Sequence, residues 1–275
     1  MLSVLDDRDL SAVLDLLDAD PVGNVFVASR VHAAGLAPER LGAQVWGYGK
    51  GSRPTSLCYA GANLIPIGSD CDAVHAFADH AARQGRRCSS IVGPADLVSV
   101  MWERLEPHWG PAREVRMRQP LMMTTAYSPI PPDTAVRRVR LDELEILLPA
   151  SIAMFTEEVG VSPVAGDGGV LYRARVRELV SSGRAFARFE DERVVFKAEI
   201  GAATNAACQV QGVWVDPRLR GRGLSVPGMA AVVASCLRDV APVVSLYVND
   251  FNAPARRAYE RVGFTEVGVF ASILF

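Results

Sequence analysis

The sequence lacks the features that mark a membrane-spanning, secreted or metal-binding protein. No apolar run reaches the roughly 18 residues needed to span a bilayer, and the first ten residues carry three aspartates and an arginine in place of an apolar signal core. The five cysteines are scattered and form no C-x-x-C pair, which is a poor pattern for a disulfide framework or a zinc site. We therefore expect a cytoplasmic protein, with no membrane partner and no metal.

Lysine is also almost absent, since Lys50 and Lys197 are the only two, and we attribute this scarcity to codon usage. The net charge is −2, so we expect no broad basic surface for nucleic acid. The sequence contains neither a phosphate-binding P-loop nor the G-x-S-x-G turn of serine hydrolases. His75 and His80 are five residues apart and do not share a helix face, so a helical two-histidine metal site is disfavoured.

What is present is the composition of a globular protein with an internal break. The 275 residues are 49% hydrophobic and 22% charged, and a chain of this length buries most of the surface that it exposes when unfolded. Three prolines, Pro129, Pro131 and Pro132, fall within four residues, where neither a helix nor a central strand can continue. We predict a linker at 128–133 between domains at 1–127 and 134–275.

The two halves share nearly one order of predicted elements, which suggests a tandem of one α/β fold. Apolar periodicity and turn residues predict, in the second half, strands at 135–139, 185–190, 193–200, 208–215, 243–248 and within 264–275, and helices at 141–158, 170–181, 225–240 and 253–262. In the first half they predict helices at 9–17, 22–34, 70–83 and 95–105, and strands at 41–48, 55–60, 63–67, 88–92 and 114–123.

The strongest chemical signal is a turn rich in arginine and glycine between a predicted strand and a predicted helix. Residues 211–224 read Gln-Gly-Val-Trp-Val-Asp-Pro-Arg-Leu-Arg-Gly-Arg-Gly-Leu. Glycine lets the backbone turn sharply and approach a ligand closely. The first N–H groups of the following helix lack internal partners and lie at the positive end of the helix dipole, which suits a phosphate. Taken alone, a G-x-G stretch of this kind would favour a basic, glycine-rich surface turn.

About thirty residues after this turn, residues 252–264 form a second motif. Residues 218–223 resemble the Q/R-x-x-G-x-G/A signature of the GNAT N-acetyltransferase superfamily, and residues 252–264 resemble its N-x-x-A-x-x-x-Y-x-x-x-G-F signature. The resemblance covers roughly 134–275, and the whole chain is similar to tandem GNAT proteins whose first domain is degenerate. It implies an α/β (α+β) fold of two GNAT-like domains, each a mixed, mostly antiparallel sheet flanked by helices.

The resemblance also implies an acetyl-CoA site in the second half. One strand would pair with the pantetheine arm, through Val213, Trp214 and Val215, and the turn would hold the pyrophosphate, through Arg218, Arg220, Gly221, Arg222, Gly223, Leu224 and Ser225. Asn252 and Tyr259 are two helical turns apart and share a face. They would complete the cofactor site, with Tyr259 protonating the departing thiolate. Pro227 and Gly228 depart from the family pattern, and we expect the helix to begin near Ser225.

The general base is less well defined by the sequence. We name Glu199, on the strand before the pantetheine strand, as the catalytic candidate. Glu157 and Glu158 at the end of the first long helix are alternatives, and each of these carboxylates could simply face solvent. Gln209 and Gln211 stand where some relatives carry an acid, and an amide cannot accept the proton. A chain of water molecules is therefore a further option.

The first half carries neither signature. At the position of the turn, residues 65–72 read Ile-Pro-Ile-Gly-Ser-Asp-Cys-Asp. Asp70 and Asp72 would repel a pyrophosphate, and Val100 stands in place of the tyrosine. We predict that this half binds no CoA and instead shapes the acceptor cleft or braces the other half.

Three functions compete. The sequence favours an acetyl-CoA-dependent N-acetyltransferase in which a primary amine attacks the thioester directly within a ternary complex. A non-catalytic module that senses acyl-CoA or binds a partner is the alternative, because fold does not fix function. Aminoacyl transfer from tRNA fits poorly, because the CoA turn is intact and no basic channel is expected. The acceptor could be a small amine, a peptide N-terminus or a lysine, and the protein a monomer or a homodimer.

Overall fold

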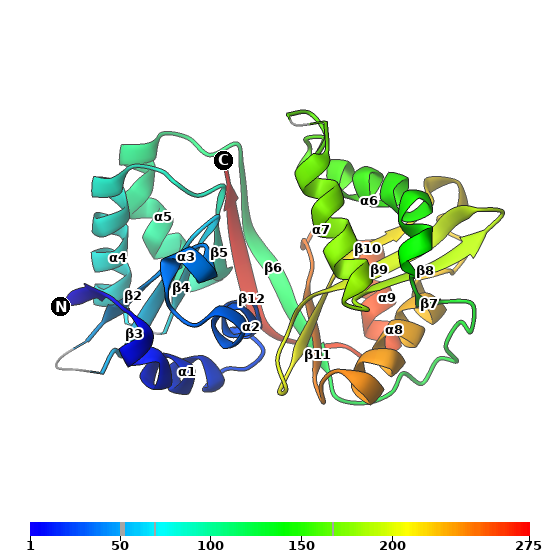
Figure 1. Cartoon of the computed structure of the whole chain (residues 1–275), viewed down its shortest axis with the longest axis horizontal. Helices are drawn as coiled ribbons and strands as arrows, with labels where there is room; N and C mark the ends of the chain where they lie inside the picture. The colour runs from blue at the N-terminus through cyan, green and yellow to red at the C-terminus, as the bar shows by residue number, and fades with distance from the viewer. Residues whose placement is uncertain (50–52, 69, 167) are drawn as a thin grey trace. The chain divides into compact units, whose positions relative to one another are not determined.

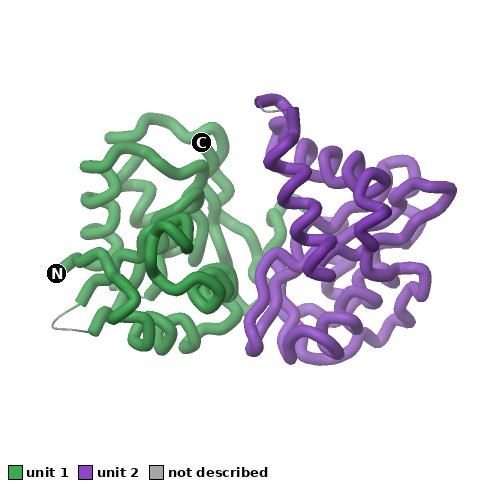
Figure 2. Tube along the Cα trace, viewed as in Figure 1, with its two compact units in different colours: residues 1–122, 247–252, 266–275 green, residues 123–246, 253–265 purple. Residues whose placement is uncertain are grey.

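The chain folds into two compact units, each formed from segments that are not contiguous in sequence (Figure 2). Unit 1 comprises residues 1–122, 247–252 and 266–275, and unit 2 comprises residues 123–246 and 253–265. The structure, a computed structural model, describes residues 1–49, 53–68, 70–166 and 168–275, so Lys50 and Ser69 lie outside the described residues. This division differs from the predicted domains 1–127 and 134–275, because the last strand of the chain packs in unit 1.

Unit 1 contains a mixed, mostly antiparallel sheet flanked by helices (Figure 1). Its strands lie in the order β1-β2-β3-β4-β5-β12-β6, with β4 and β5 parallel to each other. The strands are β1 (Leu2–Val4), β2 (Gln44–Tyr48), β3 (Ser56–Ala60), β4 (Asn63–Ile67), β5 (Ser90–Pro94), β6 (Glu114–Thr124) and β12 (Thr265–Leu274). The helices are α1 (Leu10–Asp18), α2 (Val25–Ala34), α3 (Pro38–Leu41), α4 (Cys71–Gln84) and α5 (Ala95–Trp109).

Alternation along the strands divides the apolar residues of unit 1 between two cores, because successive side chains of a strand point to opposite faces. On β2, Trp46 packs in the cluster that contains Phe77 of α4 and Met101 of α5. Its neighbour Val45 packs in the cluster that contains Val13 of α1 and Val31 of α2. Helices therefore cover both faces of the sheet, as the tandem α/β prediction requires.

The final strand of the chain completes the sheet of unit 1. β12 pairs antiparallel with β5, from Phe270 opposite Pro94 to Leu274 opposite Ser90. Ala271 and Ile273 are fully buried and belong to the core formed with α4 and α5. Residues that end the sequence are therefore part of the hydrophobic core of its first half.

The strands of unit 2 lie in the order β11-β10-β9-β8-β7. Among the described residues of unit 2, β10 and β11 run parallel, whereas the pairs β10–β9, β9–β8 and β8–β7 are antiparallel. The strands are β7 (Arg137–Arg138), β8 (Ala185–Glu190), β9 (Arg193–Ala203), β10 (Cys208–Val215) and β11 (Val244–Tyr247). The helices are α6 (Leu144–Val159), α7 (Val170–Ser181), α8 (Ser225–Asp239) and α9 (Ala253–Val262).

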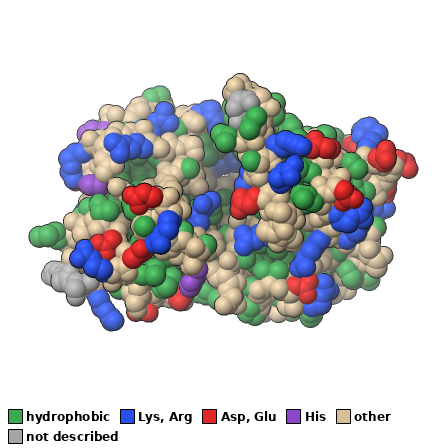
Figure 3. Space-filling view, viewed as in Figure 1, with side chains coloured by type: hydrophobic (Ala, Val, Ile, Leu, Met, Phe, Trp, Pro, Cys, Tyr) green, Lys and Arg blue, Asp and Glu red, His purple; other side chains and the backbone are tan. Residues whose placement is uncertain are grey.

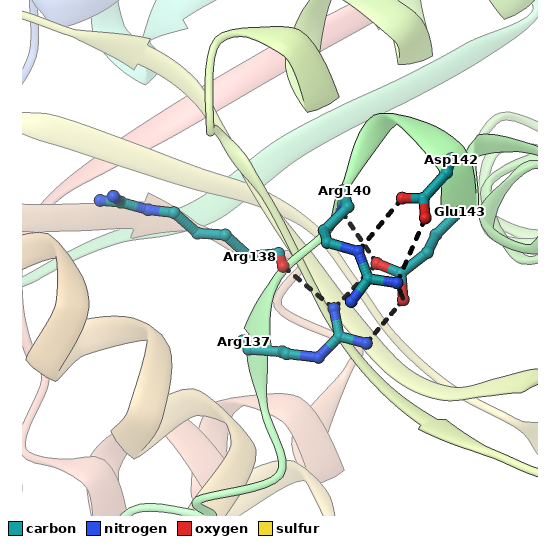
Figure 4. A network of polar contacts seen from close by, with 5 residues as sticks. All are labelled: Arg137, Arg138, Arg140, Asp142 and Glu143. Carbon is teal, nitrogen blue, oxygen red and sulfur yellow. Dashed lines mark hydrogen bonds and ion pairs between the residues drawn. The ribbon is translucent and has the colours of Figure 1, made fainter.

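An ion-pair network fixes the start of unit 2 (Figure 4). The buried carboxylate of Glu143 accepts hydrogen bonds from both terminal nitrogens of Arg137, at 2.8 and 2.6 Å, and from the backbone N–H of Arg140 at 2.9 Å. The bonds from Arg137 hold the pKa of Glu143 at about 2. The network therefore joins strand β7 to the turn that leads into α6. Arg138 points away from it and pairs with Asp239 at the end of α8, at 3.0 Å.

The predicted helices and strands are found, with shifts of a few residues at their ends. Two short elements were missed, β1 and α3, because three or four residues are too few to show a period. The predicted linker 128–133 contains neither helix nor strand, and Asp133 anchors it to Arg188 (2.8 Å) and to the carbonyl of Pro227 (3.0 Å).

The surface shows both signs of charge. On the face drawn in Figure 3, acidic and basic side chains are interspersed over both units. Among the described residues, no helix combines the length and the apolar character that crossing a membrane requires.

The position of β12 generates a prediction about stability. Ile273→Ala should destabilise unit 1 by about 2–5 kcal/mol, because it removes a fully buried side chain and leaves a cavity. Val267→Ala on the same strand is the control: this side chain is 47% exposed, so its loss should change stability by less than about 0.5 kcal/mol. Hydrogen exchange followed by mass spectrometry should show faster exchange in α4 and α5 of Ile273→Ala. An effect confined to unit 2 would contradict the assignment of β12.

Candidate active site

Strands β10 and β11 diverge after two residues and leave a backbone edge open. They pair only at Cys208 with Val244 and at Gln209 with Ser245. From Val210 to Val215, β10 continues beside β9, but among the described residues no strand pairs with its other edge. An unpaired edge can accept an extended chain with amide groups as an added strand.

A bulge interrupts β10 at Gly212. Gln211 pairs with Glu199 and Trp214 pairs with Lys197, so two residues of β10 face a single residue of β9. Gly212 has φ +59°, a left-handed conformation that glycine adopts without strain and that is typical of a bulge. A side chain at this position would also lie about 3 Å from Glu199, Met154 and Lys197.

The Gly212 carbonyl is held by a buried lysine. Lys197 is 1% exposed, and its Nζ donates to the carbonyl oxygen of Gly212 at 3.0 Å and to Glu199 Oε2 at 3.1 Å. Because the peptide bond is planar and trans, the N–H of Val213 points in the opposite direction, away from Lys197. The lysine therefore fixes the orientation of one backbone N–H at the edge of β10.

Glu199, the predicted base, lies inside this network. It is 8% exposed, and its second oxygen accepts a hydrogen bond from Gln211 Nε2 at 3.0 Å. Both carboxylate oxygens are thus hydrogen-bonded, one of them to a buried ammonium group. A buried lysine without such a counter-charge would be strongly destabilising, so Glu199 has a structural role whatever its chemical one.

The predicted phosphate turn leads directly into α8. Gly221 and Gly223 have φ +77° and +81°, and a Cβ at either position would meet nothing within 4 Å. Helix α8 begins at Ser225, as predicted. Gly228 is explained by packing, since a Cβ there would lie 2.9 Å from the ring of Phe196. The turn is therefore open, and the first N–H groups of α8 lie beside it.

The three arginines of the turn differ in their contacts. Arg218 folds back onto the buried Asp216, at 2.6 and 3.0 Å, and these bonds hold the pKa of Asp216 at about 2. Arg220 donates to Glu157 at 2.6 Å and to the carbonyl of Val215 at 3.1 Å. Arg222 is exposed, and within the described part of the chain its guanidinium has no hydrogen-bond or ion-pair partner.

Burial, and to a smaller extent the charge of Glu158, raises the pKa of both Tyr259 and Tyr172. Burial, followed by the charge of Glu158, raises the pKa of the Tyr259 hydroxyl above its usual range. Burial also raises the pKa of Tyr172, with further contributions from Glu199 and Glu158. Tyr172 donates to the carbonyl of Ser151 at 2.8 Å. Both phenols are therefore neutral near pH 7 and can act as hydrogen-bond donors.

The structure brings together some of the predicted residues and not others. Unit 2 contains Glu199, Tyr259, the strand Val213–Val215 and the whole turn, whereas Asn252 precedes α9 in the segment 247–252 of unit 1. The carboxylate of Glu157 accepts hydrogen bonds from Arg220 at 2.6 Å and from Trp214 Nε1 at 3.4 Å. Two site residues were missed, Gly212 and Lys197. A glycine inside a strand is a signal of a bulge, and Lys197 is the only lysine of the second half.

The corresponding turn of unit 1 is closed by a carboxylate. Asp70 precedes α4, and its side chain accepts a hydrogen bond from the backbone N–H of Asp72 at 2.9 Å. An N–H that could bind an anion is thereby occupied. No group of three or more His, Cys, Asp or Glu side chains suited to a metal ion occurs in the parts of either unit that the structure describes.

Two family models match the chain. Residues 169–264 match the acetyltransferase (GNAT) family, and residues 43–147 match a domain of unknown function, DUF4081. A mycothiol acetyltransferase of Brachybacterium faecium is 39% identical over 75 residues, which are 27% of this chain and 23% of that protein. The chain therefore matches less than a quarter of the length of this curated relative.

Solved structures share the fold over the whole chain. A tandem GNAT protein from the clavulanic acid biosynthesis pathway has a TM-score of 0.58 at 14% identity, covering 100% of this chain and 98% of its own. A GNAT-family acetyltransferase from Colwellia psychrerythraea has a TM-score of 0.58 at 11% identity, covering 100% and 99%. A Drosophila protein has a TM-score of 0.68 at 13% identity, covering 100% and 98%. The chain thus has the fold of these tandem GNAT structures, and residues 169–264 of its second half match the acetyltransferase (GNAT) family model.

The open turn generates a prediction about ligand binding. Replacing Gly221 and Gly223 by valine in the full chain should weaken acetyl-CoA binding by about 100-fold or more, because β-branched side chains distort a turn at positive φ and cover its N–H groups. Gly110→Val is the matched control, since Gly110 in unit 1 has φ +75° and equally open surroundings. Calorimetry provides the measurement. Wild-type affinity in the Gly221/Gly223 variant would refute the assignment of the turn.

Proposed function

We propose that the protein is an acetyl-CoA-dependent N-acetyltransferase in which a primary amine attacks the thioester directly within a ternary complex. The observation that carries the proposal is the continuity of three features in unit 2: the open edge of β10, the glycine turn, and the start of α8. An extended amide chain and a pyrophosphate are the two parts of CoA that such a surface would bind.

The residues present fit the ligand. The edge from Val213 to Val215 would bind the pantetheine amides as an added strand. The N–H groups from Gly221 to Ser225 would bind the pyrophosphate at the helix N-terminus, and Arg222 supplies positive charge that no other described residue neutralises. Arg220 and its partner Glu157 are both exposed, and exposed ion pairs are weak, so a phosphate can compete for Arg220. Arg218 is exposed but is held by the buried Asp216, so it would add positive charge beside the turn while keeping that partner.

The bulge at Gly212 orients the group that would polarise the thioester. Acetyl-CoA supplies an activated acetyl group, whose carbonyl oxygen gains negative charge as the amine attacks. The Val213 N–H, directed away from Lys197 by the Gly212 hydrogen bond, would donate to that oxygen. Fixed backbone donors in such positions are a major source of rate acceleration. Lys197 thus serves as a positioning residue.

Tyr259 would stabilise the departing thiolate. A phenol can donate only while it is protonated, and burial together with the charge of Glu158 keeps it so. Because its pKa is raised, Tyr259 is a weaker acid than a free phenol. Its contribution would be greatest once the thiolate has formed beside it.

Proton removal from the amine has two candidate carboxylates. Glu199 lies beside the bulge, with its carboxyl carbon 3.0 Å from the position of a Cβ on Gly212. It would have to release a hydrogen bond before accepting a proton. Glu158 is exposed, and its charge acts on the hydroxyls of both Tyr172 and Tyr259. We keep Glu199 as the proposed base, with Glu158 or a water chain as the alternatives.

The acceptor would be a primary amine, and the short match to a mycothiol acetyltransferase favours a small molecule. A screen of amine acceptors with acetyl-CoA tests the proposal, with the release of the free thiol of CoA as the measure of turnover. Acetyl-CoA binding with no turnover across small amines, peptide N-termini and lysines would instead support the acyl-CoA-sensing alternative.

The role of Tyr259 generates a prediction about turnover. Tyr259→Phe should lower kcat by about 10²–10⁴-fold, because it removes the donor to the leaving thiolate. Acetyl-CoA affinity should change by about 1 kcal/mol or less. Tyr172→Phe is the control, because its hydroxyl already donates to the Ser151 carbonyl, and it should retain most activity. Near wild-type turnover in Tyr259→Phe would show that this ring has only a packing role.

The two carboxylates are separated by the pH dependence of kcat/KM. Removing the general base should abolish the rise of activity with pH, whereas a structural change lowers activity at every pH and leaves the profile unchanged. We expect Glu199→Gln to flatten the profile and Glu158→Gln to retain its shape. Thermal unfolding of each variant is needed alongside, because Glu199→Gln leaves Lys197 without its counter-charge. The reverse pattern would assign the role to Glu158.

A further inference from the structure

An arginine side chain covers part of the open edge of β10. The N–H of Asp216 donates to the carbonyl of Val195 on β9 at 3.0 Å. Because the peptide bond is planar and trans, the carbonyl of Val215 points in the opposite direction, away from β9 and toward the unpaired edge. Nε of Arg220 donates to this carbonyl at 3.1 Å. One backbone acceptor of the edge is therefore already occupied.

The occupied carbonyl belongs to the surface on which the pantetheine arm would lie. In an added strand, the N–H groups of one chain pair with the carbonyls of the other. Neighbouring strands lie about 4.8 Å apart, so the Arg220 nitrogen at 3.1 Å from the Val215 oxygen takes up space that an added chain needs. The pantetheine amides and Arg220 therefore compete for the same position.

A carboxylate of α6 holds the guanidinium at the edge. Helix α6 packs beside β10 (Figure 1), and Glu157 lies in the last turn of that helix, where the helix dipole also favours a cation. Nη2 of Arg220 donates to Glu157 Oε2 at 2.6 Å, and Nε1 of Trp214 donates to Glu157 Oε1 at 3.4 Å. Arg220 therefore joins the glycine turn to both β10 and α6.

A phosphate can release this contact, whereas pantetheine alone has no group that replaces it. The side chains of Arg220 and Glu157 are 48% and 45% exposed, and exposed ion pairs contribute little to stability. The pyrophosphate of CoA would bind at the turn from which Arg220 projects, and charge-assisted bonds to phosphate oxygens are strong. The uncharged pantetheine arm offers no anion in exchange for Glu157.

We propose that Arg220 covers the pantetheine edge of β10 in the ligand-free protein and moves to the pyrophosphate when acetyl-CoA binds. The inference rests on the proposed function, because it takes acetyl-CoA as the ligand. Arg220 is then a specificity-determining residue. It disfavours acyl thioesters of pantetheine that carry no phosphate and favours those that present a pyrophosphate at the turn.

The test compares acetyl-CoA with S-acetylpantetheine, which has the same amides and thioester but no phosphate and no charge. Each is titrated into the ¹⁵N-labelled full chain. The indole N–H signal of Trp214, assigned with Trp214→Phe, reports binding at the edge. Arg220→Met should bind S-acetylpantetheine about two- to tenfold more tightly, because the Val215 carbonyl is released. It should bind acetyl-CoA about two- to tenfold more weakly, because the phosphate loses a cation.

Two further variants separate this contact from a general change of charge. Glu157→Gln weakens the hold on Arg220 but keeps the arginine, so both ligands should bind more tightly. Arg222→Met is the matched control, since it removes an exposed arginine of the same turn that has no hydrogen-bond or ion-pair partner among the described residues. It should weaken acetyl-CoA binding and leave the affinity for S-acetylpantetheine unchanged.

Three results would overturn the proposal. They are an unchanged affinity for S-acetylpantetheine in Arg220→Met and Glu157→Gln, an equal gain in Arg222→Met, and no S-acetylpantetheine binding to any variant at millimolar concentration. Each of them leaves the proposed function in place if the wild-type protein binds acetyl-CoA. Failure of the wild-type protein to bind acetyl-CoA would instead overturn the proposed function, and this inference with it.

Discussion

The candidate site depends on one buried ammonium group. Lys197 is almost fully enclosed and must be paired, because an isolated charge in the protein interior is prohibitively unfavourable. Its two partners, the Glu199 carboxylate and the Gly212 carbonyl, tie β9 to the bulge of β10. Only glycine allows both the left-handed backbone and the close approach of three side chains there. The direction of the neighbouring N–H, and hence the proposed chemistry, follows from this arrangement.

The second constraint is the position of the final strand of the chain, which lies in unit 1. β12 fills a place in the sheet of unit 1, and its buried residues belong to the core under α4 and α5. A strand from the second half of the sequence is therefore part of the sheet of unit 1. Unit 1 therefore cannot complete its core before β12 is available.

Much of this could be predicted from sequence, because the informative patterns are local. Helical periodicity, turn residues and the two spaced motifs located the elements, the glycine turn and the start of α8 at Ser225. The bond from Lys197 to the bulge at Gly212 and the position of β12 in unit 1 depend on contacts between residues that are apart in sequence, and no local pattern predicts them. The scarcity of lysine was attributed to codon usage, and Lys197 was not predicted to be a site residue, since a single residue on a strand does not reveal its burial. Arg218 and Arg220 were expected to be available for phosphate, but their partners Asp216 and Glu157 became evident only from the fold.

We propose that the two halves share a fold but that only the second binds CoA. The open glycine turn of unit 2 and the carboxylate-capped turn at Asp70 are the physical basis of that asymmetry. The stoichiometry of acetyl-CoA binding to the full chain, measured by isothermal titration calorimetry, tests it directly. We expect one acetyl-CoA per chain. A stoichiometry of two, or no binding at all, would contradict it.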